Sequence, residues 1–562
     1  MAAPKAVQDW HLVDGMLARG RRGWTVLRQH GPGQFQFWLL ALVIGIASGF
    51  AALGFRIGID TLQATLYRVE DVTRLASSAV DLPWYLFILW PTLGGLVVGL
   101  ILFRLSAGGR VRSVAEVIEG AALRDGRVEV RAGLASAAAS LITLGSGGSS
   151  GREGPVVHLA AVIATKVNDL IDARGITARD LLGCAVAAAV SASFNAPIAG
   201  ALFALEVVLR HFAVHAFAPI VIASAAGTVI NRLQFGGVTE FTLERQGVLS
   251  FYVELPAFLI LGLVCGAVAV ILMRAIFWVD DTAERWRARW NIPPWLRPAA
   301  AGAILGVIAL GFPQIIGVGY ETTSLALTGK MLAHEAMVLA AVKVAAVAIT
   351  MGGRMGGGVF SPSLMVGSLA GLAFGLIATS VFPDVSGSET LYALAGMGAV
   401  AAAVLGAPIS TTLIVFELTG DWQTGLAVMV AVSTSTALAS RLVDRSFFLT
   451  QLERRKVHLS KGPQAYLLCM FRVANVMRPP DHARAVPTDD VWEALEAGIF
   501  IDPNATLETA MPMFQDTARM WLPVVRIGDS GEAPKILGTL HHVDALQRYN
   551  RALAATAAEE HS

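Results

Sequence analysis

The chain has 562 residues, of which 55% are hydrophobic and only 15% charged, and its mean hydropathy is +0.60. Because a soluble protein carries about 25% charged residues, these values exclude a soluble protein and predict a polytopic membrane protein. The formal net charge of +1 provides no overall field for nucleic acid, so we expect no nucleic-acid partner.

The first 35 residues are polar and basic, which is unlike a signal peptide. Basic residues in a short flank of the first membrane helix stay on the cytoplasmic side. We therefore expect residues 1–35 to form a cytoplasmic N-terminal segment. Its basic residues are Lys5, Arg19, Arg21, Arg22 and Arg28.

Apolar segments then recur as far as residue 440. Several are too short to cross about 30 Å of hydrocarbon as one straight helix, whereas 250–278 is long enough to tilt strongly. A mixture of short, broken and tilted helices is typical of transporters and channels. Charged connectors are expected at 104–131, 169–179 and 280–297. The predicted spans are 36–57, 84–105, 131–144, 155–171, 179–192, 196–212, 215–232, 250–278, 298–312, 334–351, 358–381, 389–404, 407–418 and 422–440.

A glycine-rich break, Gly145–Pro155, interrupts the apolar sequence with five glycines, three serines and the pair Arg152 and Glu153. A charge at the centre of a membrane helix costs roughly 2.5–3.5 kcal/mol, and lipid cannot satisfy the N–H and C=O groups of non-helical backbone. The break is therefore expected to line a polar cavity inside the protein. Pro155 suits the first turn of a new helix, where free amides and the helix dipole favour an anion.

The same pattern occurs twice in the chain. Each copy contains a glycine-rich break ending in proline, an identical six-residue alanine-rich run, an Ala-Pro-Ile sequence and a glutamate nine positions after that proline. These elements are Gly151–Pro155, Ala185–Val190, Ala196–Ile198 and Glu206 in the first copy, and Gly356–Pro362, Ala399–Val404, Ala407–Ile409 and Glu417 in the second. Two copies of one helical unit predict a pseudo-symmetric fold with the solute site at their interface. The two glutamates are interpreted as buried, hydrogen-bonded structural carboxylates.

After about residue 458 the sequence becomes polar, and no segment there is long enough to cross a membrane. Helices are predicted at 507–514 and 542–552, and strands at 521–526 and 536–540. This alternation predicts a small α/β domain.

Four motifs, in this order and spacing, resemble those of the CLC family of anion channels and anion/proton exchangers. They are Gly151–Pro155, Asn195–Ile198, Gly358–Pro362 and Gly406–Ile409. The resemblance covers about residues 36–456, and Gly538–Asp544 carries a weaker resemblance to a CBS domain. Together, the two resemblances imply an all-α polytopic membrane protein, built from a CLC-type pseudo-symmetric repeat of broken, tilted helices, plus a small α/β cytosolic CBS-like domain. The implied domains are 36–458 in the membrane and 459–562 in the cytosol.

The resemblance also implies a site. In that family, helix N-termini from both repeats bind dehydrated anions near the membrane midplane. The resemblance assigns the role of the gate to Glu153. Its carboxylate is a tethered anion that competes with chloride for the same amides until protonation releases it. An ion pair with Arg152 is the structural alternative, but adjacent residues on a helix do not face each other. The implied anion-binding amides are those of Gly151, Arg152, Gly154, Val359 and Phe360.

The chain departs from the family pattern at both side-chain anion ligands. Alignment on 116–119 puts Arg112 at the family's filter serine and Ser113 at the next glycine. Ser113 is a candidate ligand if the loop shifts by one residue; the alternative is a differently built inner site. Phe448 replaces the filter tyrosine, and the lost hydroxyl costs on the order of 1 kcal/mol of anion binding.

A third departure concerns protons, because Val207 stands where many exchangers carry an inner proton-relay glutamate. The predicted function is transport of chloride through a pathway gated by Glu153 and linked to protons, with nitrate and fluoride as alternative anions. The alternative is a passive gated chloride channel, which Val207 and Phe448 favour. The resemblance further implies a homodimer in the lipid bilayer of a bacterial inner membrane, with both termini cytoplasmic.

No enzyme, metal or cofactor is expected. Gly145–Gly151 lacks the Gly-Lys-Ser/Thr of a phosphate loop, and His211 and His215 lack a third metal ligand nearby. Asp544 matches the ribose-contacting position of nucleotide-binding CBS domains but is a weak candidate, because His541 replaces the usual hydroxyl residue. The cysteines, read as packed thiols, are Cys184, Cys265 and Cys469.

Overall fold

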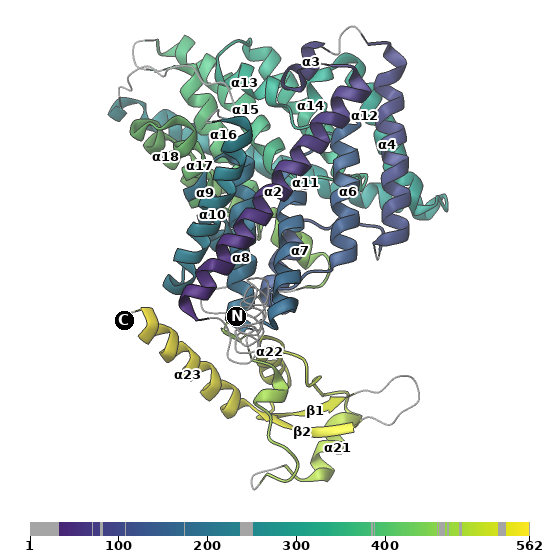
Figure 1. The fold of residues 1–562 in the computed structure, drawn as a ribbon, viewed down its shortest axis with the longest axis vertical. Helices are drawn as coiled ribbons and strands as arrows, with labels where there is room; N and C mark the ends of the chain where they lie inside the picture. Colours follow the sequence, from purple (N-terminus) through teal and green to yellow (C-terminus); the bar gives the residue numbers. More distant parts are fainter. Residues whose placement is uncertain are drawn as a thin grey trace, which may run out of the picture.

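The computed structural model describes residues 33–69, 71–78, 82–106, 108–173, 175–236, 251–383, 386, 388–457, 459, 467–468, 471–482, 486–526 and 535–560. Cys469 lies outside these residues, as do the basic residues of the N-terminal segment, Lys5, Arg19, Arg21, Arg22 and Arg28. A large unit of packed helices carries a smaller unit, the tail, at one end, and helix α2 begins at that same end (Figure 1).

The first half of the large unit contains α2 (Gln34–Tyr67), η1 (Val72–Arg74), α3 (Leu75–Ser78), α4 (Trp84–Leu105), α5 (Val114–Leu123), α6 (Val130–Gly145), α7 (Glu153–Ile171), α8 (Gly175–Phe194), α9 (Pro197–Phe203), the π-helix η3 (Ala204–Leu209) and α10 (Val214–Phe235). The second half contains α11 (Phe251–Arg289), η4 (Pro294–Leu296), α12 (Arg297–Gly311), η5 (Pro313–Ile315), α13 (Tyr320–Leu327), α14 (Ala333–Gly352), α15 (Phe360–Val381), α16 (Glu389–Leu405), α17 (Pro408–Thr419), α18 (Trp422–Leu442) and α19 (Phe447–Glu453).

Nine of the described helices are long and apolar enough to cross a membrane. Others, such as α9 and α17, are too short, whereas α11 has 39 residues and extends about 58 Å. A helix of that length is accommodated in a bilayer by tilting. The predicted mixture of short, broken and tilted helices is therefore confirmed.

Three details of the predicted spans are wrong. Helix α5 lies inside the expected connector 104–131, and α11 continues through 280–289. Both contain charged residues, but arginines partner the carboxylates, as Arg455 does for Glu116 and Arg297 does for Asp280. The predicted span 196–212 is divided into α9 and η3, which ends at Leu209.

The alanine-rich runs of both repeats form the centre of the large unit. Helices α8 and α16 carry them, and their side chains are almost fully buried. Small residues let neighbouring helices approach closely. A Cβ added to Gly367 of α15 would collide with the backbone of Gly396 of α16, and one added to Gly227 of α10 would collide with that of Ala188 of α8.

The two repeats cap each other's short helices. The Glu206 carboxylate accepts the amides of Ile409 (3.0 Å) and Ser410 (2.8 Å) at the start of α17. Equivalently, Glu417 accepts the amides of Ile198 (2.9 Å) and Ala199 (2.8 Å) at the start of α9. Both glutamates are thus hydrogen-bonded structural carboxylates, as predicted, although they are half-buried rather than buried.

The tail contains α21 (Thr488–Glu496), α22 (Leu507–Thr517), β1 (Trp521–Arg526), β2 (Lys535–His541) and α23 (His542–Glu560). β1 pairs antiparallel with β2, with Trp521 opposite His541 and Arg526 opposite Lys535. The predicted α/β character is confirmed; α21 was not predicted. The tail touches the large unit through an ion pair of Arg472 with Asp125 at 3.2 Å.

Replacing Glu206 by alanine removes three charge-assisted hydrogen bonds that join the repeats, from the amides of Ile409 and Ser410 and from the Ser410 hydroxyl. Such bonds contribute about 1.5–3 kcal/mol each, so we expect the thermal unfolding midpoint of the purified protein to fall by several degrees. Glu417→Ala is expected to have the same effect, and Glu493→Ala, at an exposed position of the tail, none. An unchanged midpoint in both cap variants would contradict the capping role.

Candidate functional site

The two glycine-rich breaks meet inside the large unit. The amide of Gly151 donates to the carbonyl of Gly358, the amide of Gly358 donates to that of Gly151, and both distances are 2.7 Å. This antiparallel bridge lies directly before the first turns of α7 and α15. The N-termini of two helices, one from each repeat, are thereby held side by side in the protein interior.

Hydroxyl groups satisfy four further backbone or hydroxyl positions of the breaks, which lipid cannot do. Residues of α6 and α14 accept amide hydrogens, and Ser150 donates to a carbonyl across the bridge. The bonds are Gly356 to Thr143 (2.8 Å), Gly357 to Ser140 (3.0 Å), Ser149 to Thr350 (3.1 Å) and Ser150 to the carbonyl of Gly356 (3.0 Å). The prediction that Gly145–Pro155 lies inside the protein is confirmed, because these residues are buried.

Glu153 is the first residue of α7, and only 2% of it is exposed. Its carboxylate crosses to the other repeat, where Oε1 accepts the hydroxyl of Ser361 and Oε2 lies 3.4 Å from the amide of Ser361. Ser361 is in the first turn of α15. Free amides and the dipole of a helix start both stabilise an anion there. The Glu153 carboxylate therefore occupies a position suited to an anion.

Arg152 turns toward other groups. It is buried, its Nη2 donates to the carbonyl of Ser193 at 3.0 Å, and its guanidinium lies 5.3 Å from the ring centre of Tyr320. It therefore places a positive charge beside the bridge while it braces α8 and α13.

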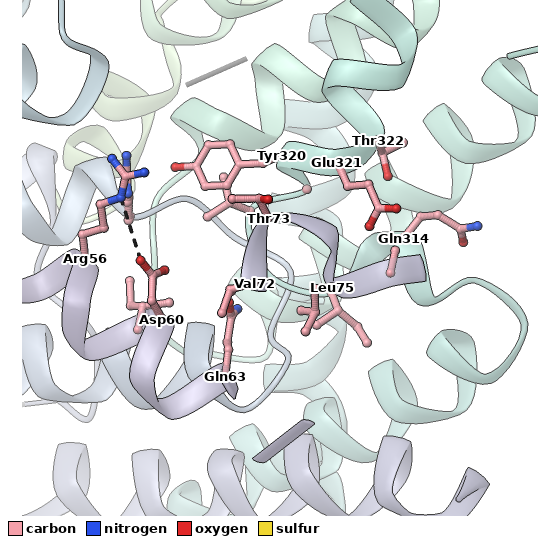
Figure 2. A pocket seen from close by; sticks show the side chains of 16 residues that line it. Arg56, Asp60, Gln63, Val72, Thr73, Leu75, Gln314, Tyr320, Glu321 and Thr322 are labelled. Atoms are coloured by element: carbon pink, nitrogen blue, oxygen red, sulfur yellow. Dashed lines mark ion pairs between the residues drawn. The ribbon is translucent and has the colours of Figure 1, made fainter. Parts of the chain in front are cut away.

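Two hollows are lined in part by residues next to the bridge. The upper hollow, about 70 Å³, lies among η1, α3 and α13, at the end of the large unit away from the tail (Figures 1 and 2). Figure 2 shows its polar lining, with Arg56 and Asp60 paired at 3.9 Å. The lower hollow, about 110 Å³, is bounded by the start of α5 and by the residues after α19. Arg152 lines the upper hollow, and Gly356 and Gly357 line the lower one.

Ser113, rather than Arg112, has its side chain at the bridge. Ser113 is the N-cap of α5, and a Cβ added to Gly154 would lie 2.5 Å from its hydroxyl oxygen. Its amide donates to Glu116 at 2.7 Å, which completes a capping box. The Arg112 side chain instead pairs with Glu129 at 3.2 Å.

For the other predicted anion ligands, the structure gives the position but no contact that indicates anion binding. The Gly151 amide is engaged by the Gly358 carbonyl, so an anion has to compete for it. Val359 and Phe360 begin α15, where the first amides have no acceptor in their own helix. Phe448 is buried in α19, with its ring 5.9 Å from that of Phe447. The anion-binding roles of these residues stay predictions.

Sequence reasoning missed Ser361. Its position inside the second motif, one residue before Pro362, was the available signal. The His215 ring lies 3.4 Å from Asp180. Within the described ranges, no group of three or more potential metal-ligating side chains is found.

In the tail, Arg478 holds Asp544 with two hydrogen bonds, from Nε at 2.6 Å and from Nη2 at 2.9 Å. These bonds keep the pKa of the Asp544 carboxyl below its ordinary value. A nucleotide ribose at this position therefore has to displace Arg478. Burial and the nearby Arg478 lower the pKa of His541.

Comparison with known proteins gives four findings. The family model described as voltage gated chloride channel matches residues 94–440. A ClcB-like chloride channel protein of Ralstonia nicotianae is 31% identical over 431 residues, which are 76% of this chain and 99% of that protein. Among solved structures, a slow cyanobacterial Cl⁻/H⁺ antiporter superposes with a TM-score of 0.67 at 20% identity, covering 75% of this chain and 98% of its own. A eukaryotic CLC transporter superposes with a TM-score of 0.65 at 18% identity and covers 93% of this chain and 98% of its own, so the likeness includes part of the tail.

Replacing Ser361 by alanine removes the hydroxyl that holds Glu153 at the start of α15. A hydrogen bond to a charged group contributes about 1.5–3 kcal/mol, so a competing anion should bind at least about tenfold more tightly. Isothermal titration of the purified protein with chloride measures this. Ser363→Ala is the matched control, because that hydroxyl bonds to Val359 of its own helix at 2.7 Å. Equal affinities in both variants would contradict the contact's role.

Arg478→Met tests the tail's ion pair. Because the folded pKa of Asp544 lies below its ordinary value of 3.8, the pair stabilises the tail above that value, and the stabilisation is lost as the pH falls below it. Amides of β1 and β2 should exchange about fivefold faster in the variant at pH 7, which corresponds to about 1 kcal/mol. The difference should shrink at pH 3. A pH-independent difference would contradict the electrostatic explanation.

Proposed function

The chain belongs to the voltage gated chloride channel (CLC) family, and on this premise we propose that it carries chloride through a pathway between its two repeats. Glu153 gates this pathway, and its protonation links anion passage to protons. The observation that carries the proposal is the Glu153 carboxylate at the first turn of α15, where it accepts hydrogen bonds from Ser361.

The gating step follows from competition between two anions. An ionised carboxylate and a chloride ion both favour a helix start with free amides and a positive dipole end. When Glu153 takes up a proton, it loses its charge and most of its advantage at this position. Chloride then takes the position, and release of the proton returns the carboxylate. Occupancy by chloride and protonation of Glu153 are thereby linked.

The proposed anion ligands are backbone amides at the two helix starts. In α7 these are the amides of Arg152 and Gly154, and in α15 those of Val359 and Phe360. The amide of Gly151 joins them only if its bond to Gly358 opens. The Ser113 hydroxyl next to Gly154 supports it as the ligand on the side of the lower hollow.

A passive chloride channel is the second candidate. Val207 is apolar and buried at the family's inner proton-relay position, and Phe448 lacks the hydroxyl of the filter tyrosine. Without a proton supply on that side, Glu153 opens and closes the path without fixed exchange. Chloride is the proposed anion in either case, with nitrate and fluoride as competitors in the same assay.

We also propose a homodimer. Glu206 and Glu417 cap helices beside Ile198 and Ile409, which are 55% and 47% exposed in one copy of the chain. Carboxylates facing lipid are costly, and a second copy over this face removes them from lipid. The tail, 459–562, is proposed as a cytosolic CBS-like unit that pairs with its copy, and Asp544 as at most a weak nucleotide contact.

The remaining topology is part of the same proposal. The membrane domain is 36–458, and 1–35 is the cytoplasmic N-terminal segment, since α2 begins at the tail's end of the large unit (Figure 1). Both termini are then cytoplasmic. The Ralstonia relative supports a bacterial inner membrane.

Glu153→Gln tests the gate in reconstituted vesicles. The amide is a permanently uncharged substitute for the protonated carboxyl, so chloride flux should continue, lose its pH dependence and drive no protons. Chloride-electrode and pH-electrode traces on the same vesicles measure both ions. Glu335→Gln, at an exposed helix start, should behave like the wild type. Retained pH dependence in Glu153→Gln contradicts the gate, and a wild type that ignores a pH gradient points to the passive channel.

A further inference from the structure

His158 is a buried ionisable side chain that the gating step does not use. It lies five residues after Glu153 on α7, about 7.5 Å further along the helix axis. Only 2% of the residue is exposed. A titratable ring therefore lies close to the proposed proton-dependent gate.

The two ring nitrogens have different surroundings. Nδ1 lies 3.1 Å from the carbonyl oxygen of Ser113. A carbonyl only accepts, so Nδ1 carries the proton, and in the neutral ring Nε2 is a bare acceptor. Nε2 is buried and has no hydrogen-bond partner among the described residues. A buried acceptor without a partner is destabilising, which a purely structural histidine would avoid.

Nε2 faces helix α6 on the tail side of the protein. A Cβ added to Gly133 of α6 would lie 2.8 Å from Nε2, so only glycine leaves room for the ring. One turn earlier is Glu129, the N-cap of α6, whose side chain is half exposed. Asp125, four residues before Glu129, pairs with Arg472 of the tail. The Nε2 side of the ring therefore faces the start of α6, on the tail side of the protein.

Nδ1 faces the gate. Its acceptor, Ser113, lines the lower hollow, and the Ser113 hydroxyl lies beside Gly154, the residue next to Glu153. The ring thus stands between an exposed carboxylate at the tail side and the hydroxyl closest to the gate.

We propose that His158 is the proton-transfer residue between the tail side and Glu153, taking the role that the apolar Val207 cannot fill. This rests on the proposed proton linkage. Nε2 takes a proton from water near Glu129, and the Nδ1 proton leaves through water at the Ser113 hydroxyl to the Glu153 carboxylate. The ring is then protonated on Nε2, and a rotation that turns Nε2–H toward Ser113 and the bare Nδ1 toward α6 readies it for the next proton. One proton enters and one leaves, and no other bond changes.

The charges around the ring suit a residue that both takes up and releases protons. Two carboxylates and two arginines surround it from α5, from the start of α6 and from the segment after α19. They are Glu116, Glu129, Arg112 and Arg455. Arg455 pairs with Glu116 and Arg112 with Glu129, so each of these carboxylates has an arginine partner.

His158→Gln separates this role from a structural one. A glutamine amide can still donate to the Ser113 carbonyl, but it cannot carry a proton at neutral pH. In vesicles we expect chloride flux within about threefold of the wild type and at least a tenfold loss of proton flux per chloride. His334→Gln, the same change at an exposed histidine, should leave the ratio unchanged.

The outcomes separate this inference from the proposed function. If the wild type couples protons and His158→Gln keeps the same ratio, the relay is wrong and the proposed function stands. If the wild type moves no protons, the linkage is wrong and the relay with it. Should His158→Gln not assemble, Glu129→Gln tests the same route at its exposed end. A proton-to-chloride ratio reduced about threefold supports the route, and an unchanged ratio overturns it.

Discussion

The pairing of Gly151 with Gly358 is the interaction on which the rest of the site depends. Non-helical backbone inside a membrane must find its hydrogen bonds within the protein, and each glycine-rich break finds them in the other and in hydroxyls of α6 and α14. Neither break can form all of these backbone hydrogen bonds without the other. The bridge therefore holds two helix starts from distant parts of the chain in one place, and this place is the proposed anion site.

At three places in the chain, a glutamate carboxylate accepts hydrogen bonds at a helix start of the opposite repeat. The hydrogen-bond distances differ among the three. Glu206 and Glu417 each hold two backbone amides at 2.8–3.0 Å on a helix start of the opposite repeat. Glu153 does the same at α15 but reaches one amide at 3.4 Å together with the Ser361 hydroxyl. The tighter pairs behave as permanent caps. The looser contact suits the proposed gate, and Glu153 lies between Arg152, which lines the upper hollow, and Gly154, which is next to Ser113 of the lower hollow's lining.

The sequence predicted what is local or repeated, and missed what depends on distant contacts. The glycine breaks, the two repeats and the α/β tail follow from composition, periodicity and motif order. The contact of Glu153 with Ser361 joins residues 208 positions apart, and no local pattern encodes it. Helix α5 was not predicted because its acidic residues are typical of a charged connector. Their burial is explained only by the structure, in which Arg455 pairs with Glu116. The sequence does indicate that Ser113 rather than Arg112 begins α5, because Ser113 and Glu116 have the spacing of a capping box.

Anion binding through backbone amides has a consequence for pH dependence. Peptide groups do not titrate, so protons can act on transport only through side chains near the bridge. On the upper side, Arg152 keeps its charge at all relevant pH values. On the lower side, Glu116 is held between Arg112 and Arg455. In the proposed scheme Glu153 is the group that competes with the anion, and His158 is the buried ring with an open acceptor behind it. The pH response proposed for the site then rests on two residues on one helix, five positions apart.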